Sequence, residues 1–395
     1  MRLGTGVAGL ACVLAIGAMV GGCGPAGPRD GRLEASAAID TAVAAEKGLD
    51  VVWHTRLLLE PNTELTQFWL RGEFLVGLGS DDRLYVARAD TGVRLWSEPI
   101  ACASGRVWPP AIADGNLWLP TTTHLFGFNG AEGKCLAKIE LEFSPAGPAV
   151  SNGVHCFMPD AKGWLQAVAI QPKTWSWGRW TEDTMSASPV LDNMFVYFAG
   201  YNGTVYASTQ NIRNIQWQQP TEGAIVADLK RNEAGLIFAA SLDYSLYAFQ
   251  GPSGRLVWRY NAGERIRRAP YPSRGQVFVF TQQAGLTALD ATNGHAVWRL
   301  AEGDDFIGAD AETVYIRSAG NDLLAVDRAS GKVRFSLPLR KGTTVAHNET
   351  DSGLLYLATR DGAIVALTRE VKAEEKKEGA AAPAAATPAP ATPAN

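Results

Sequence analysis

The stretch GQVFVFTQQAGLTALDATNGHAVW, from Gly275 to Trp298, decides the fold. It begins with an alternating apolar run, Val277, Val279 and their neighbours, which predicts a half-buried strand. Glycine-containing turns at 282–285 and 292–294 separate two further short strands. Three short antiparallel strands cannot bury an apolar face alone, so the unit needs neighbours.

Copies of the same unit recur along most of the chain. Aligning on the small residue two before Asp290 gives one copy every 37 to 41 residues, at Val86, Gly127, Ala167, Ala207, Ala248, Ala288, Ala325 and Ala366. Ten residues after the first seven comes a closing position, which is bulky except at Ala137: Trp96, Ala137, Trp177, Trp217, Trp258, Trp298 and Phe335. A period near 40 residues with four strands per unit is typical of a β-propeller. Eight copies predict eight blades.

The last copy ends before it reaches its tryptophan. The missing strand is available at the other end of the chain, where 50–53 closes on Trp53 before any copy begins. We therefore expect an all-β, eight-bladed β-propeller over residues 49–370, closed by an N-terminal strand that completes the last blade. Such closure removes the exposed sheet edges. The tryptophans and Phe335 would then lie between adjacent blades, where their large area stabilises the ring.

The N-terminus has the pattern of an export signal over residues 1–22. Arg2 precedes an apolar segment that is too short for a typical transmembrane helix. The sequence from Val20 to Cys23 resembles a bacterial lipobox, which implies that Cys23 is acylated and holds the protein at a membrane. Gly24, rather than Asp, follows it, and by resemblance to enterobacterial sorting this favours the outer membrane, facing the periplasm. The alternative is an ordinary secretory signal with an incidental cysteine.

The segments that flank the ring differ from it in composition. Residues 23–48 are predicted to be a linker, with a short helix within the Ala-rich stretch 32–47. Residues 371–395 are rich in Ala and Pro and lack apolar periodicity, so we expect a disordered tail.

Catalytic and metal-binding patterns are missing from the sequence. The net charge of −4 gives no basic footprint for nucleic acid. No HExxH, nucleophile elbow or phosphate loop occurs, and no histidine lies at metal-ligand spacing from another His or Cys. Cys102 and Cys135 lie in consecutive blades, so they either form a disulfide in an oxidising compartment or remain free thiols. Cys156 is expected to be a free thiol. We expect no catalytic residue and no metal.

Two clusters leave a choice between packing and binding. Arg265, Arg267 and Arg268 lie at a blade junction, where they either contact an acidic partner or lipid headgroups or form a solvated loop. The aromatic run containing Trp175, Trp177 and Trp180 is either a packed junction or a ligand-binding cluster.

The stretch ALDATNGHAVW, from Ala288 to Trp298, resembles the tryptophan-docking repeat of the quinoprotein (PQQ) propellers, A-x-D-x-x-T-G-x-x-x-W. Its turn recurs at Thr91-Gly92, Ser253-Gly254 and Ser330-Gly331. The dehydrogenases with this repeat usually carry adjacent cysteines, acidic and Asn ligands for calcium, and often a haem-binding CxxCH. This sequence has neither Cys-Cys nor CxxCH.

Among propellers of this kind the chain is similar to the BamB family, in the lipobox, the short linker, the chain size and the style of the closing segments 304–328 and 351–370. That resemblance implies a non-catalytic, lipid-anchored protein–protein interaction scaffold in the bacterial envelope, without a cofactor. The implied partners are envelope proteins, among them the outer-membrane β-barrel assembly machinery, with this chain as a monomeric subunit. One alternative is a ligand-binding or PQQ-binding propeller that acts as an oxidoreductase or a sensor. Another is a sensor or polysaccharide-binding module.

Overall fold

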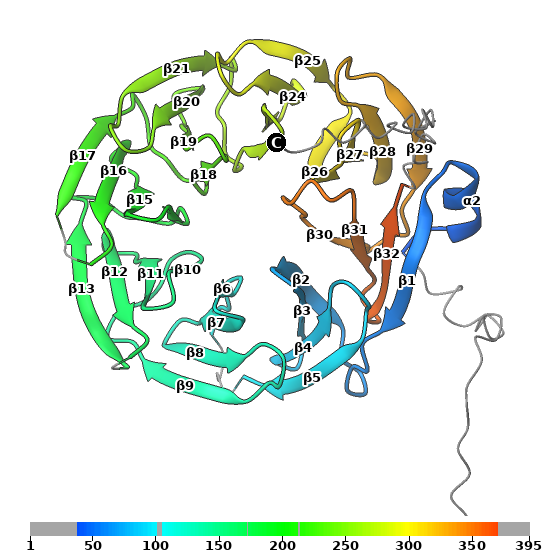
Figure 1. Ribbon diagram of the computed structural model, residues 1–395, viewed down its shortest axis with the longest axis horizontal. Coiled ribbons are helices and arrows are strands. Elements are labelled where there is room, and N and C mark those ends of the chain that lie inside the picture. Colours follow the sequence, from blue (N-terminus) through cyan, green and yellow to red (C-terminus); the bar gives the residue numbers. More distant parts are fainter. Residues whose placement is uncertain (1–37, 101–104, 172, 212–213, 370–395) are drawn as a thin grey trace, which may run out of the picture.

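The computed structural model describes residues 38–100, 105–171, 173–211 and 214–369, and these form a ring of eight four-stranded antiparallel sheets (Figure 1). The prediction of an all-β, eight-bladed propeller is confirmed. The predicted signal peptide with Cys23, most of the predicted linker and the predicted disordered tail at 371–395 lie outside the described residues.

Each blade runs outward from the central channel, so its first strand is innermost and its fourth is on the rim (Figure 1). Blades one to four are β2 (Leu65–Arg71), β3 (Phe74–Gly79), β4 (Arg83–Arg88), β5 (Arg94–Pro99); β6 (Ala111–Ala113), β7 (Asn116–Pro120), β8 (His124–Asn129), β9 (Cys135–Glu140); β10 (Val150–Ser151), β11 (His155–Pro159), β12 (Trp164–Ala169), β13 (Thr174–Trp180); and β14 (Val190–Leu191), β15 (Phe195–Ala199), β16 (Thr204–Thr209), β17 (Ile215–Pro220).

Blades five to seven continue the same order, with the unit from which the sequence analysis started forming most of blade six. They are β18 (Lys230–Arg231), β19 (Leu236–Ala240), β20 (Ser245–Gln250), β21 (Leu256–Asn261); β22 (Tyr271–Ser273), β23 (Gln276–Thr281), β24 (Gly285–Asp290), β25 (Ala296–Leu300); and β26 (Gly303–Ala309), β27 (Thr313–Ser318), β28 (Asp322–Asp327), β29 (Val333–Pro338).

Blade eight is built from both ends of the chain. Its inner strands are β30 (Thr344–Ala346), β31 (Leu355–Ala358) and β32 (Ala363–Thr368), and its outer strand is β1 (Asp50–Arg56). Strand β1 pairs antiparallel with β32, which places Trp53 opposite Ala366. The predicted closure by the N-terminal strand is confirmed.

One row of side chains explains the repeat. In blade six, Phe278, Ala288 and Trp298 lie opposite one another on β23, β24 and β25. The small residue in the middle leaves room for the aromatic rings on either side, and the Phe278 and Trp298 centroids are 5.8 Å apart. The same row of aromatic, alanine and tryptophan recurs in blades three, four, five and eight, as Phe157–Ala167–Trp177, Tyr197–Ala207–Trp217, Phe238–Ala248–Trp258 and Tyr356–Ala366–Trp53.

The rim tryptophan of one blade contacts the turn between strands three and four of the next. Trp298 Nε1 donates to the carbonyl oxygen of Arg328, at 2.8 Å, and its ring lies against Gly331. Gly331 has a φ of +72°, and a Cβ there would lie 2.6 Å from Trp298 Cγ, so only glycine fits. Equivalent bonds run from Trp53 to Ala89, Trp96 to Gly130, Trp217 to Gly251 and Trp258 to Ala291, at 2.7–3.1 Å.

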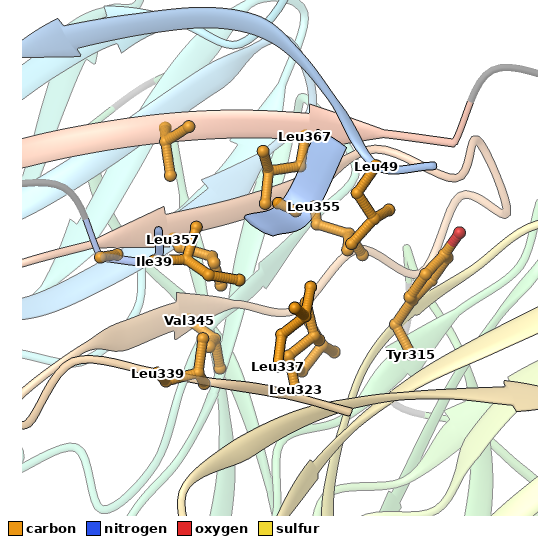
Figure 2. Close-up of a cluster of buried hydrophobic side chains, with 14 of the residues drawn as sticks. Ile39, Leu49, Tyr315, Leu323, Leu337, Leu339, Val345, Leu355, Leu357 and Leu367 are labelled. Carbon is orange, nitrogen blue, oxygen red and sulfur yellow. The ribbon is translucent and has the colours of Figure 1, made fainter. Parts of the chain in front are cut away.

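Phe335 takes the place of the rim tryptophan in blade seven, and the next blade has no turn between its third and fourth strands. Blade eight draws its third and fourth strands from opposite ends of the chain, so no turn carbonyl is available to a tryptophan N–H. The segment 38–49, which we call the clasp, fills the place instead, with Ile39 and Leu49 buried in one hydrophobic cluster (Figure 2). Phe335 packs against this cluster. The clasp contains the helix α2 (Thr41–Glu46), whose N-cap Asp40 accepts from the Ala42 and Val43 amides, and it lies within the stretch for which a short helix is predicted.

Ala137 is compensated within its own blade. Its row reads Trp118, Gly127 and Ala137 on β7, β8 and β9, so the large ring sits on the second strand and not on the fourth. Trp118 is buried and covers Gly127 so closely that a Cβ there would lie 2.5 Å from the ring. The blade that departs from the repeat in sequence therefore keeps a bulky aromatic side chain in the row.

Candidate functional site

The two sides of the ring carry different loops. Because the strands alternate in direction, the turns after strands one and three lie on one side, and the turns after strand two lie on the other with the loops between blades. We call the second side the inter-blade face; its loops are 57–64, 105–110, 141–149, 181–189, 221–229, 262–270, 301–302 and 339–343.

A cavity of about 670 Å³ opens on the inter-blade face between blades five, six and seven. We call it the arginine groove. Its lining includes Tyr244, Glu264, Arg265, Arg267, Arg268, Phe280 and Asp304. The three arginines singled out in the sequence thus line one depression, which periodicity alone did not indicate.

The acids of the groove are engaged in fixed contacts. Arg268 donates to the carbonyl oxygen of Asp304, at 2.7 Å, and to its carboxylate, at 3.2 Å, while its guanidinium lies 3.9 Å from the Phe280 ring centroid. Glu264 Oε1 accepts from the backbone amides of Gln283 and Ala284. Desolvation opposes the charge of Glu264, but these donors outweigh it and hold its pKa below the ordinary value.

Exposed apolar side chains accompany the groove on the same face. Tyr201 and Tyr244 lie in the turns after strand two of blades four and five, and they are 43% and 45% exposed. Leu58, in the loop from blade eight to blade one, is 68% exposed. Tyrosines with an apolar body and a polar tip are common in protein interfaces.

The central channel holds a second polar cluster. Lys230 Nζ lies 2.6 Å from Glu349 Oε1, and Arg71 donates to the carbonyl oxygens of Pro110 and Leu70. Desolvation raises the pKa of Asp228, although the Ser188 amide donates to it. Desolvation also opposes the charge of Glu349, but Lys230, Arg71 and His347 together outweigh it and lower the pKa of that carboxyl.

The channel cluster continues across three blades. His347 lies with Nε2 3.0 Å from Asp305 Oδ2 and Nδ1 3.4 Å from the Tyr271 hydroxyl, and Arg317 contacts the same carboxylate at 3.1 Å. Burial raises the pKa of Tyr271. Opposite charges are thus paired within the protein, which fits a cluster that holds blades together.

The aromatic run of blade three is divided by the strand. Trp177 is buried and packs with Phe157 and Phe198 at the junction with blade four, and among the described residues its Nε1 has no hydrogen-bond partner. Trp175 and Trp180 are each about half exposed on β13. The three residues do not form one cluster.

Candidate reactive groups do not converge in the part of the chain that the structure describes. No group of three or more His, Cys, Asp or Glu side chains there could hold a metal ion. Cys135 is exposed and Cys156 is buried, while Cys102, the predicted alternative partner of Cys135, lies outside the described residues. Over the same residues, no helix is long and apolar enough to cross a membrane.

Comparison with known proteins agrees with this geometry. The family described as outer membrane protein assembly factor BamB matches residues 201–307. The crystal structure of BamB from Moraxella catarrhalis superposes with a TM-score of 0.65 at 16% identity, over 82% of this chain and 98% of that one. The chain is a BamB-like propeller of the PQQ type.

Other propellers share the architecture of this BamB-like ring. The computationally designed Ika8 protein superposes with a TM-score of 0.63 at 12% identity, over 80% of this chain and all of the designed one. No curated protein sequence matches the chain. Since identities are low, the structural likeness establishes the fold alone.

Proposed function

We propose that this chain is a non-catalytic protein–protein interaction scaffold of the bacterial envelope, which docks partner proteins on its inter-blade face. The observation that carries the proposal is the combination of a BamB-like ring with a face that presents Tyr201, Tyr244 and a cationic groove. Arginine and tyrosine are enriched among residues that dominate interface energies.

The channel cluster supports a scaffold without chemistry. Lys230, Glu349, His347 and Asp305 each have a partner within the protein, so these four groups are paired with one another. A PQQ site of the dehydrogenase type would need calcium ligands, and the described residues contain no group of three or more His, Cys, Asp or Glu side chains that could hold a metal ion. We therefore propose that the protein works without a quinone.

Crosslinking in intact cells tests the scaffold function. A photoreactive residue at Tyr201 or Tyr244 should capture envelope proteins, and the same residue at Val93, which is exposed in the turn after strand three of blade one, is the control from the opposite side. Barrel-assembly components among the captured proteins would support the role that the BamB likeness implies. Equal capture from both sides would count against a docking face.

We further propose that Cys23 is acylated and anchors the ring at the outer membrane, facing the periplasm. The lipobox resemblance of 20–23 supports this, and residues 24–37 would separate the anchor from the clasp. Mass spectrometry of the mature N-terminus tests it. A Cys23→Ser protein that is processed and retained at the membrane like the wild type would contradict it.

The second candidate, a quinone-binding propeller, is tested independently. Purified protein is incubated with PQQ and calcium, and the absorbance of bound quinone and dye-linked alcohol oxidation are measured. Retained chromophore with turnover would replace the scaffold proposal by an enzymatic one.

A further inference from the structure

The arginine groove contains two arginines for which the described residues supply no partner. Arg265 and Arg267 are exposed, and neither has a hydrogen bond or an ion pair within the described parts of the chain. Arg268 and Asp304, by contrast, satisfy one another, and Glu264 is held by backbone amides. Backbone amides leave Glu264 ionised, so the three arginines and two carboxylates of the groove carry a net charge of +1. Arg265 and Arg267 are the two cations that neither carboxylate engages.

The loop that carries these two arginines is fixed at one point. Ile266, between them, is fully buried in the core shared by blades five and six. Its burial holds the backbone, so the two flanking side chains start from a defined position. Ligand binding then costs less conformational entropy than it would in a mobile loop.

From this charge we infer that the arginine groove binds an acidic, extended segment of a partner protein. The guanidinium fork matches a carboxylate in two parallel hydrogen bonds, and two such groups spaced by one residue suit acidic side chains along a strand-like peptide. Phe280 and the exposed Tyr244 add aromatic surface beside the cations, a combination typical of protein interfaces. The groove is concave, which fits a peptide better than a planar membrane surface.

The inference rests on the proposed scaffold function and names the chemistry of its partner. Its test uses the purified full chain in detergent and a fluorescein-labelled decapeptide of alternating glutamate and tyrosine, followed by fluorescence anisotropy. The glutamine–tyrosine decapeptide is the uncharged probe. Binding should be confined to the glutamate peptide and should weaken as salt is added.

The decisive variant is the double substitution Arg265→Gln with Arg267→Gln. We expect an affinity loss of about tenfold or more, because charge-assisted bonds to two carboxylates disappear. The matched control is Arg94→Gln with Arg255→Gln, which removes the same charge from exposed positions on the other side of the ring and should leave binding unchanged. Thermal unfolding of both variants shows whether each is folded.

Three results would overturn the inference. The first is that the glutamine peptide binds as tightly as the glutamate peptide. The second is that the Arg265→Gln, Arg267→Gln variant keeps the wild-type affinity. The third is that phosphatidylglycerol vesicles or inorganic phosphate bind through these arginines and the peptide does not. Capture in cells separates this inference from the scaffold function. If photocrosslinking in cells still captures envelope proteins although the peptide does not bind, the groove assignment alone is overturned. If the peptide binds but photocrosslinking captures no protein, the scaffold function alone is overturned.

Discussion

Trp298 Nε1 donates to the carbonyl oxygen of Arg328 across the junction between blades six and seven, at 2.8 Å. Trp177 occupies the equivalent place in blade three, yet its Nε1 is buried without a partner among the described residues. The blade after Trp177 lacks the turn glycine against which Trp298 and the other bonded tryptophans pack, since its sequence at 209–214 is TQNIRN. The two tryptophans share packing and differ in one hydrogen bond.

The two tryptophans predict different losses of folding stability when each is replaced by phenylalanine. Trp298→Phe should lower the free energy of unfolding by about 1 kcal/mol through the lost hydrogen bond, in addition to the smaller ring. Trp177→Phe should cost less, because it also removes an unsatisfied buried N–H. Denaturation midpoints in guanidinium chloride measure both. A Trp177→Phe protein that is the less stable of the two would show that the hydrogen bond contributes little.

Gly331 supports the same junction through its lack of a side chain. Gly331→Ala should destabilise by the cost of an alanine at positive φ, about 1–2 kcal/mol, and by about 1–3 kcal/mol more for the clash with Trp298. Gly275 has a similar φ of +77° and open space around a Cβ, so Gly275→Ala should show only the first part. Equal midpoints for the two variants would exclude a contribution from the contact.

The repeat in the sequence was sufficient for the fold and insufficient for the surface. Spacing located Ala288 and Trp298 because every blade must solve the same packing problem, and the incomplete last copy located the closing strand at Trp53. It gave no account of Ala137, because the compensating Trp118 lies on another strand of the row. The spacing did not predict the arginine groove either, because its residues share no common period. Tyr244 lies in a turn of blade five, Arg265 in the loop that leads into blade six, and Asp304 at the start of β26 in blade seven.

Blade two offers a test of the row itself. Gly127→Ala should destabilise the protein by about 1–3 kcal/mol, because its Cβ would overlap the Trp118 ring. Combining it with Trp118→Phe gives the phenylalanine–alanine pair found in blades three, five and six, so the double variant should be more stable than the sum of the single changes by about 1 kcal/mol. A double-mutant cycle measured by chemical denaturation checks the coupling. Strict additivity would mean that the residues do not compete for space.

The channel carboxylates predict opposite effects of pH. The pKa of Glu349 is lowered in the folded protein, so its contribution to stability is present above the ordinary value and is lost as the pH falls through the folded value. The pKa of Asp228 is raised, so its contribution is present below the ordinary value and is lost as the pH rises through the folded one.

Substitution of either carboxyl should therefore change the slope of the stability profile. Between pH 7 and pH 3, Glu349→Gln should lose less stability than the wild type, because the loss due to Glu349 is gone. Asp228→Asn should lose more, because the compensating gain from protonating Asp228 is gone, while the asparagine still accepts from the Ser188 amide. Urea midpoints measured across that pH range show whether each variant loses more or less stability than the wild type. Parallel profiles for all three proteins would show that water in the channel screens both groups, and the channel cluster would then contribute packing alone.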